Sequence, residues 1–594
     1  MPTLNWMGKD KVVNHHRDVP FRVLERIPEK GVLDSRGSDC GNMIIHGDNL
    51  EALKALLPEY EGRIDCVYID PPYNTGNEGW VYNDNVNDPR IRKWLGQVVG
   101  KEGEDFSRHD KWLCMMYPRL QLLRKLLAPT GVIFISIDDV ELANLKLVCD
   151  EIFGASCFVS DISWQRTYST RNDSKGVPSE VEHILVYGKQ AEWQPKKLPR
   201  TTEMDSKYKN PDGDVMAWTS SDAFAPGAAT HQGMVYAVQH PFTGELIYPT
   251  QSRCWTFNQD QILEYMNCWC PYKLEDIDDV DRRAEVCGLN PVDVRPGVKA
   301  IVLAGTLEES RRLAQAIQEN GPWPRLYFTR NGKGGIRRKT YLDSVGGRLP
   351  TNFWPYSEVG HTDEAKKELK AIFGGKAPFD TPKPTRLIER VLQIAAGDDA
   401  IILDSFAGSG TTADATMRLN ESDGGSRRYI LIEMMDYADT VTAERARRVI
   451  SGYGDGKSSV PGIDSGFSYH ELGRTLFDSG DVQVQEAFFS TLPPLNSEVP
   501  IDAVRRYVWY TETRAPFIDR SGECPWLLGE HAQAAYYLVY SPGGETVLDY
   551  DLLADLPVKG SPTVIYASRC ALSKERLETM GIVFKQIPSQ IARM

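Results

Sequence analysis

The sequence lacks a long hydrophobic run and a segment typical of secreted proteins. None of its apolar stretches approaches the ~18 residues that a membrane-spanning helix requires, and no basic segment followed by an apolar one stands at the amino terminus. With 41% hydrophobic and 25% charged residues, the composition is that of an ordinary globular protein. We therefore expect a cytoplasmic protein with no membrane partner, folded as roughly two to four domains.

Structural zinc knuckles are also missing. The 11 cysteines are scattered and include no CxxC pair, and Cys66 and Cys149 lie inside apolar patterns that are typical of buried free thiols. Six residues could be arranged as a metal site, namely Cys254, Cys268, Cys270, Cys287, His231 and His240. Because their spacing lacks the knuckle, we predict no metal.

Two phosphate-binding signatures are incomplete. Residues 452–458 are one residue short of a Walker loop, and Gly408-x-Gly410 lacks the third glycine of a dinucleotide turn, where Ala413 stands instead. The net charge of −14 argues against a protein that coats nucleic acid through bulk charge, but it leaves room for a local basic groove. The glycine turn therefore suits a nucleoside without a pyrophosphate.

An acidic turn ends an apolar strand in the first half of the chain. Asp70-Pro71-Pro72-Tyr73 follows residues 66–69, which predict a strand buried on both faces of a parallel sheet. The prolines end this strand, and open α/β sheets bind their ligands at such carboxyl ends. The carboxylate and a backbone carbonyl would accept hydrogen bonds from the N–H groups of a planar amine, while Tyr73 covers its ring. The alternative is a tight turn with a surface acid.

A glycine-rich loop follows a second apolar strand, residues 400–403. Lys383-Pro384-Thr385 opens the preceding helix, and a third strand, residues 428–432, ends at Glu433. The loop consists of Asp404, Ser405, Phe406, Ala407, Gly408, Ser409, Gly410, Thr411 and Thr412. Its glycines allow a ligand to approach a helix amino terminus closely, and an acid at the end of the next strand is placed to bind ribose hydroxyls.

These motifs together resemble the amino-methylating DNA methyltransferases. DPPY looks like their catalytic motif, and DxFxGxG looks like their S-adenosylmethionine motif. The catalytic motif comes first and the cofactor motif last, as in the β permutation of that family. The longer pieces DPPYNTG, PKPTRLIERVL and DSFAGSGTT are similar to the modification (Mod) subunits of type III restriction-modification systems. The match covers roughly residues 40–190 and 325–475.

The resemblance implies an α/β fold, a doubly wound, mostly parallel seven-stranded sheet in permuted order. The strand ending at Asp404 would lie beside the strand ending at Asp70. We expect an N-terminal arm (1–40), a catalytic half (41–189), an inserted, irregular target-recognition domain (190–350), a cofactor-binding half (351–475) and a small C-terminal α/β module (476–594) for dimerisation or partner docking. Within the module, residues 501–510 suggest a strand or mixed segment, and the polar loop 74–110 could be a lid.

The resemblance also implies roles for individual residues. Asp70, Pro71, Pro72 and Tyr73 would bind and orient the target amine. Asp48 would lie near the cofactor adenine, and Glu433 would bind its ribose. The remaining cofactor-binding residues would be Lys383, Pro384, Thr385, Asp404, Phe406, Gly408, Gly410 and Thr411.

The implied reaction is methylation of adenine N6 in duplex DNA after the base is flipped out of the helix. Asp at the first position of the motif looks like the adenine members, whereas Ser is commoner in the cytosine-N4 members. Cytosine-N4 methylation, methylation of RNA on the same fold, and a non-catalytic DNA-binding subunit stay open as alternatives. The protein would be the modification part of a restriction-modification or related phage-defence system.

The end of the inserted region carries five basic residues within ten positions and no acid. They are Arg330, Lys333, Arg337, Arg338 and Lys339. We predict that they contact DNA phosphates, the alternative being a solvated turn. The implied partners are duplex DNA, a second copy of the chain and a separate restriction subunit, in a bacterial or archaeal protein associated with the nucleoid.

Overall fold

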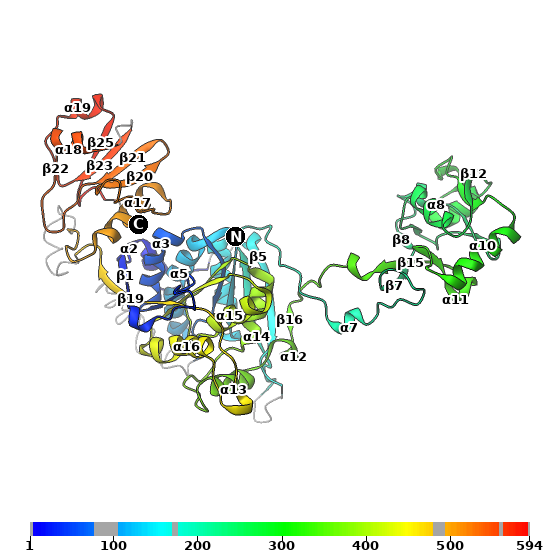
Figure 1. Ribbon diagram of the computed structural model, residues 1–594, viewed down its shortest axis with the longest axis horizontal. Coiled ribbons are helices and arrows are strands. Elements are labelled where there is room, and N and C mark those ends of the chain that lie inside the picture. The colour runs from blue at the N-terminus through cyan, green and yellow to red at the C-terminus, as the bar shows by residue number, and fades with distance from the viewer. Residues whose placement is uncertain (1–3, 76–104, 169–175, 479–493, 558–561, 592–594) are drawn as a thin grey trace. The chain divides into compact units, whose positions relative to one another are not determined.

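The computed structural model describes residues 4–75, 105–168, 176–478, 494–557 and 562–591, with only the backbone of residues 105–107 (Figure 1). Most of the predicted lid therefore lies outside the described residues. The chain forms two compact units. Unit 1 comprises Met1–Lys196 and Pro350–Met594, and unit 2 is the intervening segment Lys197–Leu349. Across the described residues, no helix combines the length and the apolar character needed to cross a bilayer.

Unit 1 is built on one mixed sheet of ten strands. In order across the sheet these are β1 (Arg22–Arg26), β19 (Ser468–Thr475), β2 (Met43–His46), β18 (Arg428–Glu433), β17 (Ile401–Asp404), β3 (Ile64–Ile69), β4 (Leu127–Ile137), β6 (Val181–Gly188), β5 (Phe158–Gln165) and β16 (Phe353–Trp354). The seven strands from β2 to β5 correspond to the predicted sheet. β1 and β19 extend one edge and β16 the other, so the predicted count of seven was too low.

The parallel part of the sheet interleaves the two halves of the chain. β17 and β18, from the second half, lie between β2 and β3, from the first. β17 runs parallel to β3, with Ile402 opposite Cys66, and the Ile401 N–H donates to Asp65, 336 residues earlier in the chain, at 2.9 Å. This confirms that the strands ending at Asp70 and Asp404 are neighbours. Both strands therefore deliver their end residues to the same edge of the sheet.

The strands are apolar throughout because helices cover both faces of the sheet. In β18, Ile430 and Ile432 pack with helices on one face, whereas Tyr429 and Leu431 pack on the other. The first face is covered by α3 (Asn49–Tyr60), α5 (Asp105–Leu126) and α6 (Asp139–Cys149), and the second by α15 (Thr411–Asp423) and α16 (Glu444–Ser451). α14 (Thr385–Ala395) packs against α15. This alternation produces the doubly wound α/β fold that the sequence predicts.

The first residues of the chain are not simply an arm. Two short helices, α1 (Lys9–Val12) and α2 (His15–Asp18), lie here, and Trp6, Val12 and Val19, in or next to them, belong to the same buried cluster as α5. β1 pairs with β19. The C-terminal module has a four-stranded sheet of β20 (Leu527–His531), β21 (Ala534–Leu538), β23 (Thr563–Ala567) and β25 (Ile582–Gln586), with α18 (Tyr550–Asp555) and α19 (Lys574–Thr579).

One segment of the C-terminal module was assigned wrongly from the sequence. Residues 501–510, expected to be a strand or mixed, belong to helix α17 (Ile501–Thr513). Val504, Tyr507 and Val508 recur at helical spacing and are buried against the module. β-branched and aromatic residues favour strands locally, but this packing outweighs that preference.

Unit 2 contains three small sheets, of three, four and two strands, and an aromatic core. The three-stranded sheet has the order β14 (Leu326–Phe328), β15 (Ile336–Tyr341), β7 (Trp218–Asp222). The four-stranded sheet has the order β10 (Leu246–Ile247), β9 (Val238–Gln239), β13 (Ala300–Leu303), β12 (Tyr272–Glu275). With α8 (Gln259–Asn267) and α10 (Leu307–Asn320) they enclose a core that includes Trp255 and Trp269. The predicted inserted segment, 190–350, thus corresponds closely to an independent compact unit.

Candidate functional site

A cavity of about 670 Å³ lies in unit 1 at the carboxyl ends of β3, β17 and β18. Its volume is in the usual range for small-molecule sites. Ten of the predicted site residues line it, namely Asp70, Pro71, Pro72, Tyr73, Lys383, Asp404, Phe406, Gly408, Thr411 and Glu433. The acidic turn and the glycine loop therefore open on one space.

The acidic turn is fixed from both sides. The Trp112 indole, on α5, donates to the Pro72 carbonyl at 2.7 Å. Asn74 adopts the left-handed conformation with φ of 60°, and its side chain contacts the fully buried Glu141 of α6. Because two helices anchor the turn, Asp70 and Tyr73 are held at the cavity.

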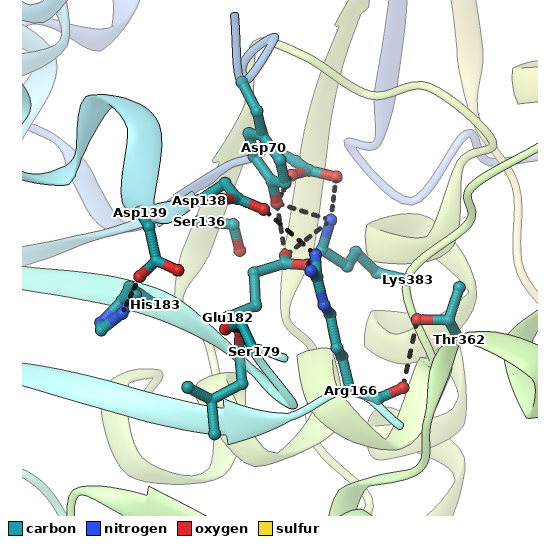
Figure 2. A network of polar contacts seen from close by, with 12 residues as sticks. Asp70, Ser136, Asp138, Asp139, Arg166, Ser179, Glu182, His183, Thr362 and Lys383 are labelled. Atoms are coloured by element: carbon teal, nitrogen blue, oxygen red, sulfur yellow. Dashed lines mark hydrogen bonds and ion pairs between the residues drawn. The ribbon is translucent and has the colours of Figure 1, made fainter. Parts of the chain in front are cut away.

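The Lys383 ammonium lies at the centre of the polar side of the cavity. It donates to Asp70 Oδ2 at 2.6 Å and to the Tyr73 hydroxyl at 2.9 Å, and lies 3.2 Å from Glu182 Oε1. The Tyr73 hydroxyl in turn lies 2.6 Å from Asp70 Oδ1 and contacts Glu182 Oε1. Figure 2 shows Lys383 directed toward both carboxylates. One cation thus links the acidic turn to the residues that open α14.

Glu182 and Arg166 are members of this network that the sequence analysis missed. Glu182 is the second residue of β6 and is 5% exposed, and Arg166 follows β5. An Arg166 guanidinium nitrogen lies 3.2 Å from Asp138 and 3.5 Å from Glu182 Oε2. The signal available in the sequence was an acid at the start of an otherwise apolar strand.

Burial and charge shift the pKa values of these groups. Burial, followed by the neighbouring Asp70 and Glu182 carboxylates, raises the pKa of the Tyr73 hydroxyl well above its usual range. Burial lowers the pKa of the Lys383 ammonium, but the same two carboxylates outweigh it and leave the pKa above its ordinary value. Tyr73 therefore stays neutral and Lys383 stays charged near pH 7.

The glycine loop begins at a buried carboxyl group. The Phe406 N–H donates to Asp404 Oδ1 at 3.0 Å, and the Thr412 hydroxyl donates to Oδ2 at 2.6 Å. Burial raises the pKa of Asp404 from 3.8 to about 7, although these hydrogen bonds oppose the shift. Asp404 thus ties the first turn of α15 to the end of β17.

Glu433 stabilises the loop from the next strand. It accepts hydrogen bonds from the Gly408 N–H at 2.8 Å and from the Met435 N–H at 3.0 Å. Burial raises its pKa from 4.5 to about 7. The predicted ribose-binding acid therefore lines the cavity and also supports the loop.

The loop requires glycine at two positions. Gly408 and Gly410 have φ of 52° and 76°. A Cβ on Gly410 would lie 2.7 Å from the Thr442 carbonyl oxygen, and one on Gly408 would lie 3.1 Å from the Phe379 ring. Phe379 lines the cavity with Tyr437, whose ring lies 5.7 Å away edge to face. Because neither glycine carries a Cβ, the backbone of the loop stays accessible to a ligand beside the rings of Phe379 and Tyr437.

Three other predicted residues support the site without lining the cavity. Gly410 precedes α15 and Pro384 precedes α14. The Thr385 hydroxyl accepts from Arg445 at 2.9 Å, and Arg445 also donates to Thr411 at 2.8 Å. Arg445 is 1% exposed, and it was not identified from the sequence. Its guanidinium joins the starts of α14 and α15.

Asp48 does not line the cavity. Its carboxylate caps α3 by accepting from the Leu50 and Glu51 N–H groups at 2.8 and 3.2 Å, and it lies 3.6 Å from Arg119. Asp48 is in the position expected of a helix cap. The structure therefore does not bring it to the cavity with the other predicted residues.

The predicted basic patch in unit 2 is only partly at the surface. Arg330 and Lys333 are exposed, whereas Arg337 and Arg338, on β15, are half-buried. The Lys339 side chain is 0% exposed and pairs with Asp212 at 2.5 Å and with Asp214 at 2.6 Å. The expectation that Lys339 contacts DNA was wrong, because β15 turns it into the interior of the unit.

Comparisons with known proteins agree on one family. The family model described as a DNA methylase (N6_N4_Mtase) matches residues 64–444. The StyLTI Mod subunit of a type III restriction-modification enzyme from Salmonella typhimurium is 32% identical over 72% of this chain and 57% of its own length. The EcoPI Mod subunit from Escherichia phage P1 is 28% identical over 73% of this chain and 63% of its own length. The chain thus spans about three fifths of these relatives.

A shorter relative is matched more completely. The type II methyltransferase M.KpnI from Klebsiella pneumoniae is 30% identical over 69% of this chain and 84% of its own length. The matched range of the family model includes both the acidic turn and the glycine loop. From the cavity, the two motifs and these matches, the chain belongs to the DNA methylase family of the N6_N4 type.

Proposed function

We propose that this protein transfers a methyl group from S-adenosylmethionine to the N6 amino group of adenine in duplex DNA. It would be the modification part of a restriction-modification or related phage-defence system. The observation that carries the proposal is that the acidic turn after β3 and the glycine loop after β17 line the same cavity from adjacent parallel strands. Methyl transfer requires a donor and an amine held in line, and such orientation contributes several kcal/mol to a rate.

The residues of the cavity fit S-adenosylmethionine. The Gly408 and Gly410 backbone leaves room that a Cβ would remove, and the Phe379 and Tyr437 rings suit a planar base. Glu433 lies at the end of the strand next to the glycine loop, where an acid can accept ribose hydroxyls. When bound, the cofactor supplies a methyl group already activated on a positively charged sulfonium.

The chain's own residues then bind and orient the amine. Asp70 accepts a hydrogen bond from an N–H of the target amino group and stabilises the positive charge that develops on the amino nitrogen. A base inside a duplex cannot reach the cavity, so the target base has to be extruded. The half-buried Tyr73 then stacks on it. The Lys383 ammonium lies over one face of the Tyr73 ring, 5.1 Å from the ring centroid. The base would therefore stack on the other face.

Unit 2 would recognise the target sequence. Its exposed Arg330 and Lys333 suit contacts with phosphates, which fix the register of a protein on DNA, and Arg337 and Arg338 are partly accessible beside them. Two named relatives are Mod subunits of larger restriction enzymes. We infer by analogy that this protein pairs with a separate restriction subunit and acts as a homodimer.

The test is to incubate the purified protein with S-adenosylmethionine and unmethylated duplex DNA, and to identify modified nucleosides by mass spectrometry. We expect N6-methyladenine from the wild type, none from Asp70→Ala, and normal amounts from Glu421→Gln, which removes an exposed acid of α15. Detection of N4-methylcytosine instead would support the same methyl transfer with cytosine, and not adenine, as the target base. Methylation of RNA alone would refute the proposed substrate.

A further inference from the structure

Both oxygens of the Asp70 carboxylate already have a donor in the structure. Its Oδ1 lies 2.6 Å from the Tyr73 hydroxyl and its Oδ2 accepts from Lys383 at 2.6 Å. A target amine that donates to this carboxylate competes with these donors for its lone pairs and weakens their contacts with Asp70. Because burying a cation without a partner is strongly unfavourable, Lys383, which is 10% exposed, needs a second acceptor when Asp70 releases it.

Glu182 is placed to be that acceptor. Its Oε1 already contacts both donors, the Lys383 ammonium at 3.2 Å and the Tyr73 hydroxyl. Its Oε2 lies 3.5 Å from Arg166, which Asp138 holds from the other side. The carboxylate is therefore fixed with one oxygen toward Arg166 and the other toward Lys383 and Tyr73. Figure 2 shows the Glu182 carboxylate close to the side-chain ends of both Arg166 and Lys383.

We propose that Glu182 is a positioning residue for methyl transfer: it retains Lys383 and Tyr73 while Asp70 exchanges them for the N–H bonds of the target amine. The inference rests on the proposed function and assigns a role to a residue outside both motifs. Lys383 then stays beside Asp70 as a fixed charge, and the Tyr73 ring stays aligned for stacking. Without Glu182, Lys383 remains bound to Asp70 and competes with the substrate.

The main variant is Glu182→Gln, which keeps the size of the side chain and removes its charge. We expect kcat to fall by about tenfold or more, within the range typical of a lost polar group in an active site. Affinity for S-adenosylmethionine should fall less than kcat, because Glu182 contacts Tyr73 and Lys383, and of these only Lys383 is predicted to bind the cofactor. Asp161→Asn is the matched control. It removes a carboxylate from the neighbouring strand β5, where Asp161 pairs with His183 at 3.0 Å.

A second measurement reports on Lys383 without requiring activity. The rate at which acetic anhydride modifies Lys383 is followed against pH by mass spectrometry, since only the neutral amine reacts. Glu182 is one of the two carboxylates that raise the pKa of Lys383. Glu182→Gln should therefore make Lys383 react at lower pH, and the alkaline limb of the kcat profile should shift in the same direction. Asp161→Asn should leave both unchanged.

The outcomes separate the inference from the proposed function. Normal kcat in Glu182→Gln, or a lower kcat with unchanged Lys383 reactivity, would overturn the positioning role. If Glu182→Gln does not fold, Glu182→Asp, which keeps the charge one methylene further away, should fold and show a smaller loss of kcat with a shifted Lys383 profile. An unchanged profile in that variant would also count against the inference. A wild type that methylates no nucleic acid would refute the proposed function itself.

Discussion

Replacing Arg445 with methionine should destabilise the fold and weaken cofactor binding together. Arg445, on α16, is 1% exposed and pairs with the fully buried Asp414 of α15 at 2.9 Å. It also donates to the Thr411 and Thr385 hydroxyls at 2.8 and 2.9 Å. The methionine side chain fills part of the volume but supplies no donor.

The expected loss in unfolding free energy is about 3–5 kcal/mol, the usual result of removing one partner of a buried ion pair. Arg418 also pairs with Asp414, at 2.6 Å, which keeps the loss near the lower end of this range. Each threonine hydroxyl that loses its partner adds roughly 1 kcal/mol. Since Thr411 begins α15 at the glycine loop and Thr385 begins α14 two residues after Lys383, affinity for S-adenosylmethionine should fall by about tenfold or more.

Urea unfolding and calorimetric titration with the cofactor measure the two effects. Arg448→Met, on the same helix, is the control. Arg448 is 38% exposed and pairs with Glu444, so its loss should reduce the unfolding free energy by less than about 1 kcal/mol. A single variant within about 1 kcal/mol of the wild type would refute the reasoning.

Further predictions concern the pH dependence of stability, and the buried and the exposed basic residues of unit 2. Because burial raises the pKa of Asp404 from 3.8 to about 7, its contribution to stability is fully present below pH 3.8 and is lost as the pH rises toward 7. Urea unfolding at several pH values should show a smaller dependence in Asp404→Asn than in the wild type, because Glu433, whose pKa burial also raises to about 7, still contributes in the variant. Lys339→Met should lower the stability of unit 2 by about 3–5 kcal/mol in calorimetry, because it leaves the buried Asp212 carboxylate without its cation, and normal stability would refute the buried pair. Arg330→Ala and Lys333→Ala should leave the melting temperature unchanged and each reduce the salt dependence of DNA binding by about one unit of slope. An unchanged slope would exclude these two residues from phosphate contact.

The parts of the site that could be predicted are those encoded locally. Residues 66–69 and 400–403 are continuous apolar runs, and each ends in an acid that the structure places in the cavity. Glu182 could not be placed in this way, because its proximity to Tyr73 depends on β6 pairing with β4 in the sheet. That pairing is set by long-range packing, and no short motif encodes it.

Lys339 shows that a local pattern can also predict a surface role for a residue that the fold buries. Five basic residues in ten positions favoured a surface patch, but Lys339 is buried within β15, where it pairs with two carboxylates. Its partners Asp212 and Asp214 lie more than a hundred residues earlier in the chain. A charge count along the sequence cannot distinguish a side chain that meets a phosphate from one that is neutralised by a distant acid.

The interleaved strand order has a consequence for synthesis on the ribosome. β2 lies between β18 and β19, and both neighbours are translated about four hundred residues later. Until then β2 has no partner on either side, and its Ile44 and Ile45, both 0% exposed in the finished protein, have no complete core to enter. Nascent chains with unpaired strands and exposed apolar surface are prone to aggregate and to bind chaperones. The sheet of unit 1 therefore stays incomplete until the residues up to Thr475 have been synthesised.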